Sequence, residues 1–112
     1  MDLDTWQSRL ESELARFVDF IVTHYSPQKI ILFGSLAEGT SRLWSDIDLV
    51  VIRDTNERFL DRSKELLSSL MPKVGLDLLI YTPAEFEQLC QERKFFREKI
   101  LKKGKVLYER SN

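Results

Sequence analysis

The spacing of apolar and polar residues divides the chain into helical and extended segments. Apolar side chains from Trp6 to Tyr25 recur at the spacing of one helical face, whereas the later apolar runs are short and continuous, as in buried strands. Ser26-Pro27 ends the first helix, because the residue before a proline avoids helical backbone angles. The pattern predicts helices over 5–25 with Asp4 as N-cap, over 57–70 and over 93–103, a helix opening with the capping box Thr82 to Glu85, strands over 29–33, 46–53 and 75–81, and a short strand or tail over 105–108.

The order of these elements limits how the strands can pair. A polar loop joins strands 29–33 and 46–53, so we expect them to run antiparallel with their loop ends together. The helix between strands 46–53 and 75–81 predicts a crossover connection and hence a parallel pair. The sequence thus predicts an α/β (α+β) fold in which a small mixed sheet of three or four strands is flanked by helices.

Length and composition argue against several classes of protein. A chain of 112 residues is expected to form a single domain, residues 1–112, and its net charge of -1 does not favour direct binding to nucleic acid. The acidic N-terminus has no apolar signal core and no apolar run reaches membrane-spanning length, so no membrane association is expected. Cys90, the only cysteine, is interpreted as a packed small hydrophobe, and a reducing cytoplasm is the expected location.

Three aspartates stand out at the predicted strands. Asp46 and Asp48 project from the same face, because strand side chains alternate with a period of two. Asp77 is the single carboxylate of an otherwise apolar strand, where we expect it to be buried, and burying an unpaired charge is costly. Parallel pairing of the two strands would bring all three together. A divalent metal such as Mg²⁺ or Mn²⁺ would then offset their mutual repulsion.

Gly34 and Ser35 directly follow the first predicted strand. Glycine permits a positive φ and a close approach of the backbone to a phosphate, and Ser35 offers its hydroxyl and amide from the start of a short helix. Taken singly, the aspartates also have structural explanations, as a turn cap, an ion-pair partner or the start of a strand. The combination of Gly34-Ser35, ten intervening residues and Asp46-Ile47-Asp48 favours a nucleotide site over those explanations.

This spacing resembles the signature of the nucleotidyltransferase superfamily that shares its catalytic core with DNA polymerase beta. From Ile30 to about Tyr108, the chain looks most similar to the minimal nucleotidyltransferases, or MNT proteins, which are antitoxins of toxin–antitoxin pairs with HEPN-domain partners. The resemblance implies the nucleotidyltransferase fold. It also implies Mg²⁺-dependent transfer of AMP from ATP to a tyrosine of the HEPN toxin, that is, AMPylation.

The resemblance further implies roles for individual residues. Asp46, Asp48 and Asp77 would hold two Mg²⁺ ions, with Asp77 nearest the attacking hydroxyl. The residues that would bind the phosphates of ATP are Gly34, Ser35 and Arg42.

One position departs from the family pattern. Many small members have a basic residue in a Gly-Ser-x-Ala-Arg-Gly segment, at the position where this chain has Glu38. A carboxylate pointing inward there would repel a triphosphate. Two outcomes are consistent with this: Glu38 faces solvent while Arg42 or a partner supplies the cation, or nucleotide binding is weakened.

Two other functions fit the same residues. The chain could neutralise a HEPN partner by binding alone, without catalysis, or it could be a small-molecule nucleotidyltransferase of the aminoglycoside-modifying type. The chain has no second domain to hold an acceptor, so we expect the acceptor surface to come from another subunit, in a hetero-oligomer or a homodimer.

Overall fold

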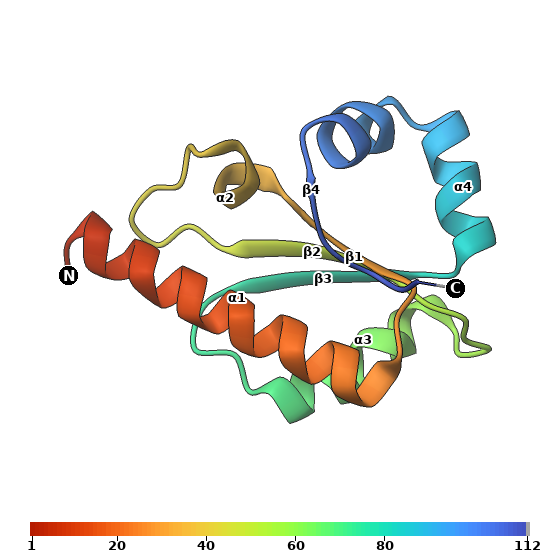
Figure 1. Cartoon of the computed structure of the whole chain (residues 1–112), viewed down its shortest axis with the longest axis horizontal. Coiled ribbons are helices and arrows are strands. Elements are labelled where there is room, and N and C mark those ends of the chain that lie inside the picture. The colour runs from red at the N-terminus through yellow and green to blue at the C-terminus, as the bar shows by residue number, and fades with distance from the viewer. Residues whose placement is uncertain (112) are drawn as a thin grey trace.

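Four strands form one mixed sheet, with helices packed against it (Figure 1). The structure is a computed structural model, and it describes residues 1–111. In chain order the elements are α1 (Leu3–Tyr25), β1 (Lys29–Phe33), α2 (Gly34–Glu38), β2 (Ile47–Ile52), α3 (Phe59–Leu70), β3 (Leu76–Tyr81), α4 (Pro83–Glu92), the π-helix η1 (Phe96–Lys102) and β4 (Lys105–Glu109).

The sheet has the strand order β3-β2-β1-β4, which confirms the predicted fold class. β1 and β2 pair antiparallel, and β2 and β3 pair parallel, as their connections predicted. The predicted short strand or tail near the C-terminus is a strand, β4, which pairs antiparallel with the other side of β1. The crossover through α3 therefore brings the starts of β2 and β3 to the same edge of the sheet.

Helices cover both faces of the sheet. Figure 1 shows α1 and α3 on one face and α4 on the other, where η1 also packs. A hydrophobic core lies on each face of the sheet, and neighbouring residues of β2 pack into different ones. Leu49 faces α1 and Val50 faces the α4 side, and both are fully buried. Leu10 and Phe17 of the predicted helical stripe are also fully buried. Within residues 1–111, no helix is long and apolar enough to cross a membrane.

The first helix begins earlier than predicted. Asp2, and not Asp4, is the N-cap of α1, and its carboxylate accepts a hydrogen bond from the Thr5 amide at 2.7 Å. Asp4 lies in the first turn instead, where the helix dipole also favours an acidic side chain. Sequence alone offered two aspartates at suitable positions, and only backbone geometry distinguishes them.

The C-terminal segment departs furthest from the prediction. The capping box at Thr82 and Glu85 is present, so α4 starts where the sequence indicated. Arg93 has an extended backbone and ends α4, and the chain is helical again from Lys94, with residues 96–102 forming the π-helix η1. The prediction of a helix over 93–103 was therefore confirmed in its position to within a residue and wrong in its helical type.

Candidate active site

The candidate site lies at the edge of the sheet where β1 ends and where β2 and β3 begin. Phe33 at the end of β1 pairs with Asp48, and Asp48 pairs with Asp77 of the parallel neighbour β3. The three side chains project from the sheet face that carries α4 and η1. Strand pairing alone therefore places two carboxylates side by side.

Asp48 is the most perturbed carboxylate of this edge. The pKa of Asp48 is raised to about 7, first by burial, then by a hydrogen bond with Asp77 and by the charges of Asp77 and Asp46. Each of these effects disfavours the ionised form when no cation is present. A positive charge beside Asp48 and Asp77 would favour the ionised form of Asp48. The position therefore suits a residue that binds a cation.

Asp77 differs in burial from the prediction. The sequence suggested a buried carboxylate, but Asp77 is exposed in the structure. The reason is its place in the sheet, since β3 is an edge strand and Asp77 is only its second residue. The apolar neighbours that suggested burial, Leu76 and Leu78, lie on the opposite face of the strand.

Asp46 lies just before β2 and is exposed. Its carboxylate packs against Gly75, where an added Cβ would overlap Asp46 Oδ1. The Ile47 amide also donates a hydrogen bond to the Gly75 carbonyl at 2.9 Å, which fixes the two segments side by side. Asp46 thus contributes charge beside Asp48. Among residues 1–111, however, no three His, Cys, Asp or Glu side chains converge as a ready set of metal ligands.

Gly34 and Ser35 begin the short helix α2, as predicted for the segment after the first strand. Gly34 has a φ of 77°, and an added Cβ would overlap Asp48 Oδ2. Only glycine therefore fits between the backbone and the carboxylate. Arg42 is exposed in the following loop, where its amide donates to Ser45 Oγ at 2.7 Å. The phosphate contacts assigned to Gly34, Ser35 and Arg42 remain predictions.

Glu38 has partners that the sequence analysis did not identify. Lys99 Nζ lies 4.0 Å and Lys103 Nζ 3.9 Å from its carboxylate, and both lysines come from the C-terminal helical segment. The Glu38 side chain is only 26% exposed, so it does not simply face solvent. The spacing of the two lysines places them on one helical face, but nothing in the sequence indicates that this face packs against Glu38.

The loop before Asp46 is tied to the N-terminal helix. Trp6, predicted only as a core residue, is 5% exposed and donates a hydrogen bond from Nε1 to the Ser45 carbonyl at 3.1 Å. Its ring lies 4.8 Å from that of Trp44, which has a φ of 71° and is exposed. These contacts hold the loop that leads into Asp46.

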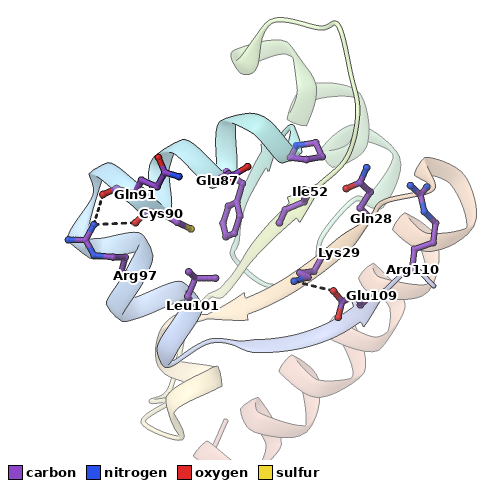
Figure 2. Close-up of a pocket in the computed structure, with 12 residues that line it drawn as sticks. Gln28, Lys29, Ile52, Glu87, Cys90, Gln91, Arg97, Leu101, Glu109 and Arg110 are labelled. Atoms are coloured by element: carbon purple, nitrogen blue, oxygen red, sulfur yellow. Dashed lines mark hydrogen bonds and ion pairs between the residues drawn. The ribbon is translucent and has the colours of Figure 1, made fainter. Parts of the chain in front are cut away.

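A separate cavity of about 730 Å³ lies at the opposite end of β1 and β2 (Figure 2). Ile52 and Phe86 are among its apolar lining residues, and the ion pair of Lys29 and Glu109, at 3.2 Å, lies along it. It includes none of the predicted site residues. The position of this cavity therefore does not mark the candidate site, where Asp46 and Asp77 are exposed.

Comparison with known proteins assigns the chain to a family. Residues 16–112 match the family described as polymerase beta, nucleotidyltransferase. The chain belongs to this nucleotidyltransferase family. A protein of Methanocaldococcus jannaschii named "Putative protein adenylyltransferase MJ0604" is 32% identical over 102 residues, which cover 88% of this chain and 97% of that protein. Every residue of the candidate site lies within the matched family region. The predicted resemblance and the enzyme class are confirmed.

Solved structures agree with the nucleotidyltransferase fold. A crystal structure described as "a putative nucleotidyltransferase from Sulfolobus solfataricus" superposes with a TM-score of 0.67 at 17% identity, covering 95% of this chain and 86% of that chain. A structure described as "the toxin-antitoxin with AMP-PNP" is more distant, with a TM-score of 0.49 at 23% identity over 90% and 74% of the two chains.

Nucleotidyltransferases of this family usually require a divalent metal, and the donors at the edge of the sheet suit one. The paired oxygen donors of Asp48 and Asp77 are of the kind that Mg²⁺ prefers. Mg²⁺ is commonly bound by one or two carboxylates together with substrate phosphates, so two adjacent carboxylates are sufficient protein ligands. Because Gly34 has no side chain, the Asp48 carboxylate can lie directly against the backbone at the start of α2. The residues at this edge of the sheet are therefore suited to bind Mg²⁺.

Proposed function

We propose that this nucleotidyltransferase transfers AMP from ATP to a tyrosine hydroxyl of a partner HEPN-domain toxin and so acts as its antitoxin. The observation that carries the proposal is the pairing of Asp48 with Asp77 beside Gly34, the residue that follows β1. This arrangement puts two carboxylates next to the backbone at the start of α2, at one edge of the sheet. Two adjacent carboxylates can hold the divalent metal that neutralises charge during transfer at a phosphorus atom.

The reaction forms one bond and breaks one bond. The tyrosine Oη attacks the α-phosphorus of ATP, the bond from that phosphorus to the bridging oxygen breaks, and pyrophosphate leaves with that oxygen. The phenolic proton passes to a carboxylate or to solvent. The products are the tyrosine–AMP phosphodiester and pyrophosphate. The protein must therefore align the two oxygens and stabilise the charge that develops on them.

Each predicted residue has a separate part in this step. We assign the phosphates of ATP to Gly34, Ser35 and Arg42, and Mg²⁺ ions to Asp46, Asp48 and Asp77. Bound Mg²⁺ would supply charge neutralisation at the attacking and leaving oxygens. Asp77, the more exposed member of the pair, faces the side from which a large acceptor can approach, and it can accept the phenolic proton.

Separate observations support a protein as the acceptor. The relative from Methanocaldococcus jannaschii is named as a protein adenylyltransferase, and it is matched over nearly its whole length. This supports a protein acceptor over a small molecule. A HEPN toxin as the acceptor is supported by the resemblance of the Gly34 to Asp48 segment to minimal nucleotidyltransferases. The open edge around Asp77 is consistent with a bulky protein substrate.

The test is an intact-mass measurement on the co-purified complex. The chain is co-expressed with the product of its neighbouring gene, purified, and incubated with ATP and Mg²⁺. We expect the partner to gain about 329 Da for each AMP group, with the adduct on tyrosine. Asp48→Asn should abolish the adduct while the complex still forms. Asp19→Asn, a change at an exposed carboxylate of α1, is the matched control and should leave the adduct unchanged.

Other outcomes would select the alternatives. A partner that is neutralised without any adduct, and equally by Asp46→Ala and Asp48→Ala, would show inhibition by binding alone. An adduct on an aminoglycoside but not on the partner would show a small-molecule enzyme. Either result would overturn the proposal.

A further inference from the structure

Two lysines from the C-terminal segment converge on the short helix that follows β1. Lys99 and Lys103 lie four residues apart, and their ammonium groups are 4.0 Å and 3.9 Å from different oxygens of Glu38. Both lysine side chains remain about half exposed, at 45% and 49%. Glu38 therefore holds the two side chains in place and leaves donors on each ammonium free for another ligand.

Strand pairing independently brings the end of η1 to the end of β1. In the antiparallel pair of β1 and β4, Leu32 lies opposite Lys105, which follows Lys103 by two residues, and Gly34 follows Leu32 by two residues. Gly104 makes this approach possible, because an added Cβ would overlap the Ile100 carbonyl and press on the Leu32 carbonyl. Backbone geometry therefore brings the last turn of η1 to the end of β1.

Aromatic packing holds the start of the same helical segment at this edge. The ring of Phe95 meets that of Phe33 edge-on at 6.0 Å, and Phe33 is the strand partner of Asp48. Phe96 packs beside Phe95 and is buried. The C-terminal helical segment is thus fixed at both ends against the strand that carries Gly34, and the lysines between are held near it.

The charge balance explains why two lysines are useful there. The segment from Gly34 to Ser41 contains no lysine or arginine, and its only charged residue is the acidic Glu38. Two lysines on one helical face repel each other unless an anion lies between them. Glu38 offsets one of their charges, and the group keeps one net positive charge at the rim of an otherwise acidic edge.

We infer that Lys99 and Lys103, positioned by Glu38, bind the β- and γ-phosphates of the nucleoside triphosphate. The inference rests on the proposed function, because it assumes that ATP binds beside Gly34. In this arrangement η1 and the residue that follows it supply cations that the segment from Gly34 to Ser41 lacks. Glu38 is a positioning residue and does not itself face the phosphates.

Titration calorimetry with ATP and with AMP, each with Mg²⁺, tests the inference. For the double variant Lys99→Gln/Lys103→Gln we expect ATP binding at least about tenfold weaker, because two charge-assisted contacts are lost. AMP binding should change less than about twofold, since AMP lacks the terminal phosphates. The matched control is Lys94→Gln/Lys102→Gln, which removes the same charge from exposed positions of the same segment and should bind ATP as the wild type does.

The outcomes separate this inference from the proposed function. If the wild-type chain binds ATP and the double variant binds it equally well, the inference is wrong and the proposed function stands. If the wild-type chain binds neither nucleotide, the proposed function itself fails. Equal weakening in the double variant and in the control would indicate a general charge effect and would also reject the inference. Thermal unfolding of each variant checks that the weaker binding does not come from unfolding.

Discussion

At the residue scale, the site depends on glycines that leave room for carboxylates. Gly75 lies against Asp46 Oδ1, the free end of a short side chain, and its φ is not in the left-handed region. Gly75→Ala should therefore move the Asp46 carboxylate without straining the backbone. We expect transfer activity to fall about tenfold to a hundredfold, while the free energy of unfolding changes by less than about 0.5 kcal/mol. AMP transfer and urea unfolding measure the two effects.

Gly39→Ala is the matched control for Gly75→Ala. Gly39 has a φ of 75°, and an added Cβ would meet nothing within 4 Å. This variant should lose about 1 kcal/mol of stability from backbone strain and keep its transfer activity. If Gly75→Ala and Gly39→Ala both lost stability and both kept their transfer activity, the result would contradict the role assigned to Gly75.

Residue-level prediction from the sequence succeeded where local geometry decides the outcome. The period of two along a strand and the crossover through one helix were enough to place Asp48 beside Asp77. The partners of Glu38 and the role of Gly75 depend on contacts between distant segments. Those contacts follow from packing, which periodicity does not describe.

At the scale of elements, a buried glutamate and the arginine paired with it in α1 tie this helix to the end of α3. Glu13 is 6% exposed, accepts a hydrogen bond from the Arg16 guanidinium at 2.6 Å, and accepts another from the Lys73 amide at 2.7 Å. Arg16 in turn donates to the Leu70 carbonyl at 2.7 Å. Glu13→Ala should lower the free energy of unfolding by about 2–3 kcal/mol, because it leaves Arg16 and the Lys73 amide without their acceptor.

The matched control for Glu13→Ala is Glu11→Ala on the exposed side of the same helix, where we expect a change below about 0.5 kcal/mol. Urea unfolding of both variants measures the difference. Similar losses would mean that helix propensity and not the buried contacts determines the result. This tie could not be predicted from the sequence, because Glu13 looks like any polar position of an amphipathic helix.

A second ion pair joins α3 to α4 and makes stability depend on pH. Arg62 is 7% exposed in its side chain and lies 2.6 Å from Glu85. The Arg62 guanidinium, followed by the Thr82 amide, lowers the pKa of Glu85 to about 2. A lowered pKa in the folded state stabilises the protein above the ordinary pKa of 4.5, and this contribution is lost as the pH falls from there towards about 2.

The change that tests this pH dependence is Glu85→Gln. Because the Glu85 side chain is 43% exposed, we expect a loss of only about 1 kcal/mol at neutral pH. The difference from the wild type should shrink as the pH is lowered through the window between the two pKa values. Urea unfolding at neutral pH and in that acidic window measures it, and a difference that stays constant would refute the assignment.

At the scale of the whole molecule, the order of elements determined most of the fold, and packing determined the rest. The polar loop and the crossover predicted the three-strand arrangement, and the fourth strand followed from a short apolar run. The π-helix was not predicted, because a spacing of 3.6 residues cannot describe its wider turn. That helix matters for the site, since its last turn brings Lys103 to the end of β1.

The whole molecule should also show a conflict between stability and binding at Asp48. Without a cation, the half-buried Asp48 lies beside Asp77, and both burial and repulsion oppose its charge. Asp48→Asn removes that charge, so we expect the ligand-free chain to gain about 1 kcal/mol of stability. ATP with Mg²⁺ at a hundred times its Kd should stabilise the wild type by about 2.7 kcal/mol and Asp48→Asn far less. Thermal unfolding with and without the ligand measures both effects, and Asp19→Asn should show the wild-type shift.

A ligand-free Asp48→Asn variant that is less stable than the wild type would contradict this prediction. It would mean that the Asp48 carboxylate contributes to folding, and the assignment of Asp48 to a cation would lose its physical basis.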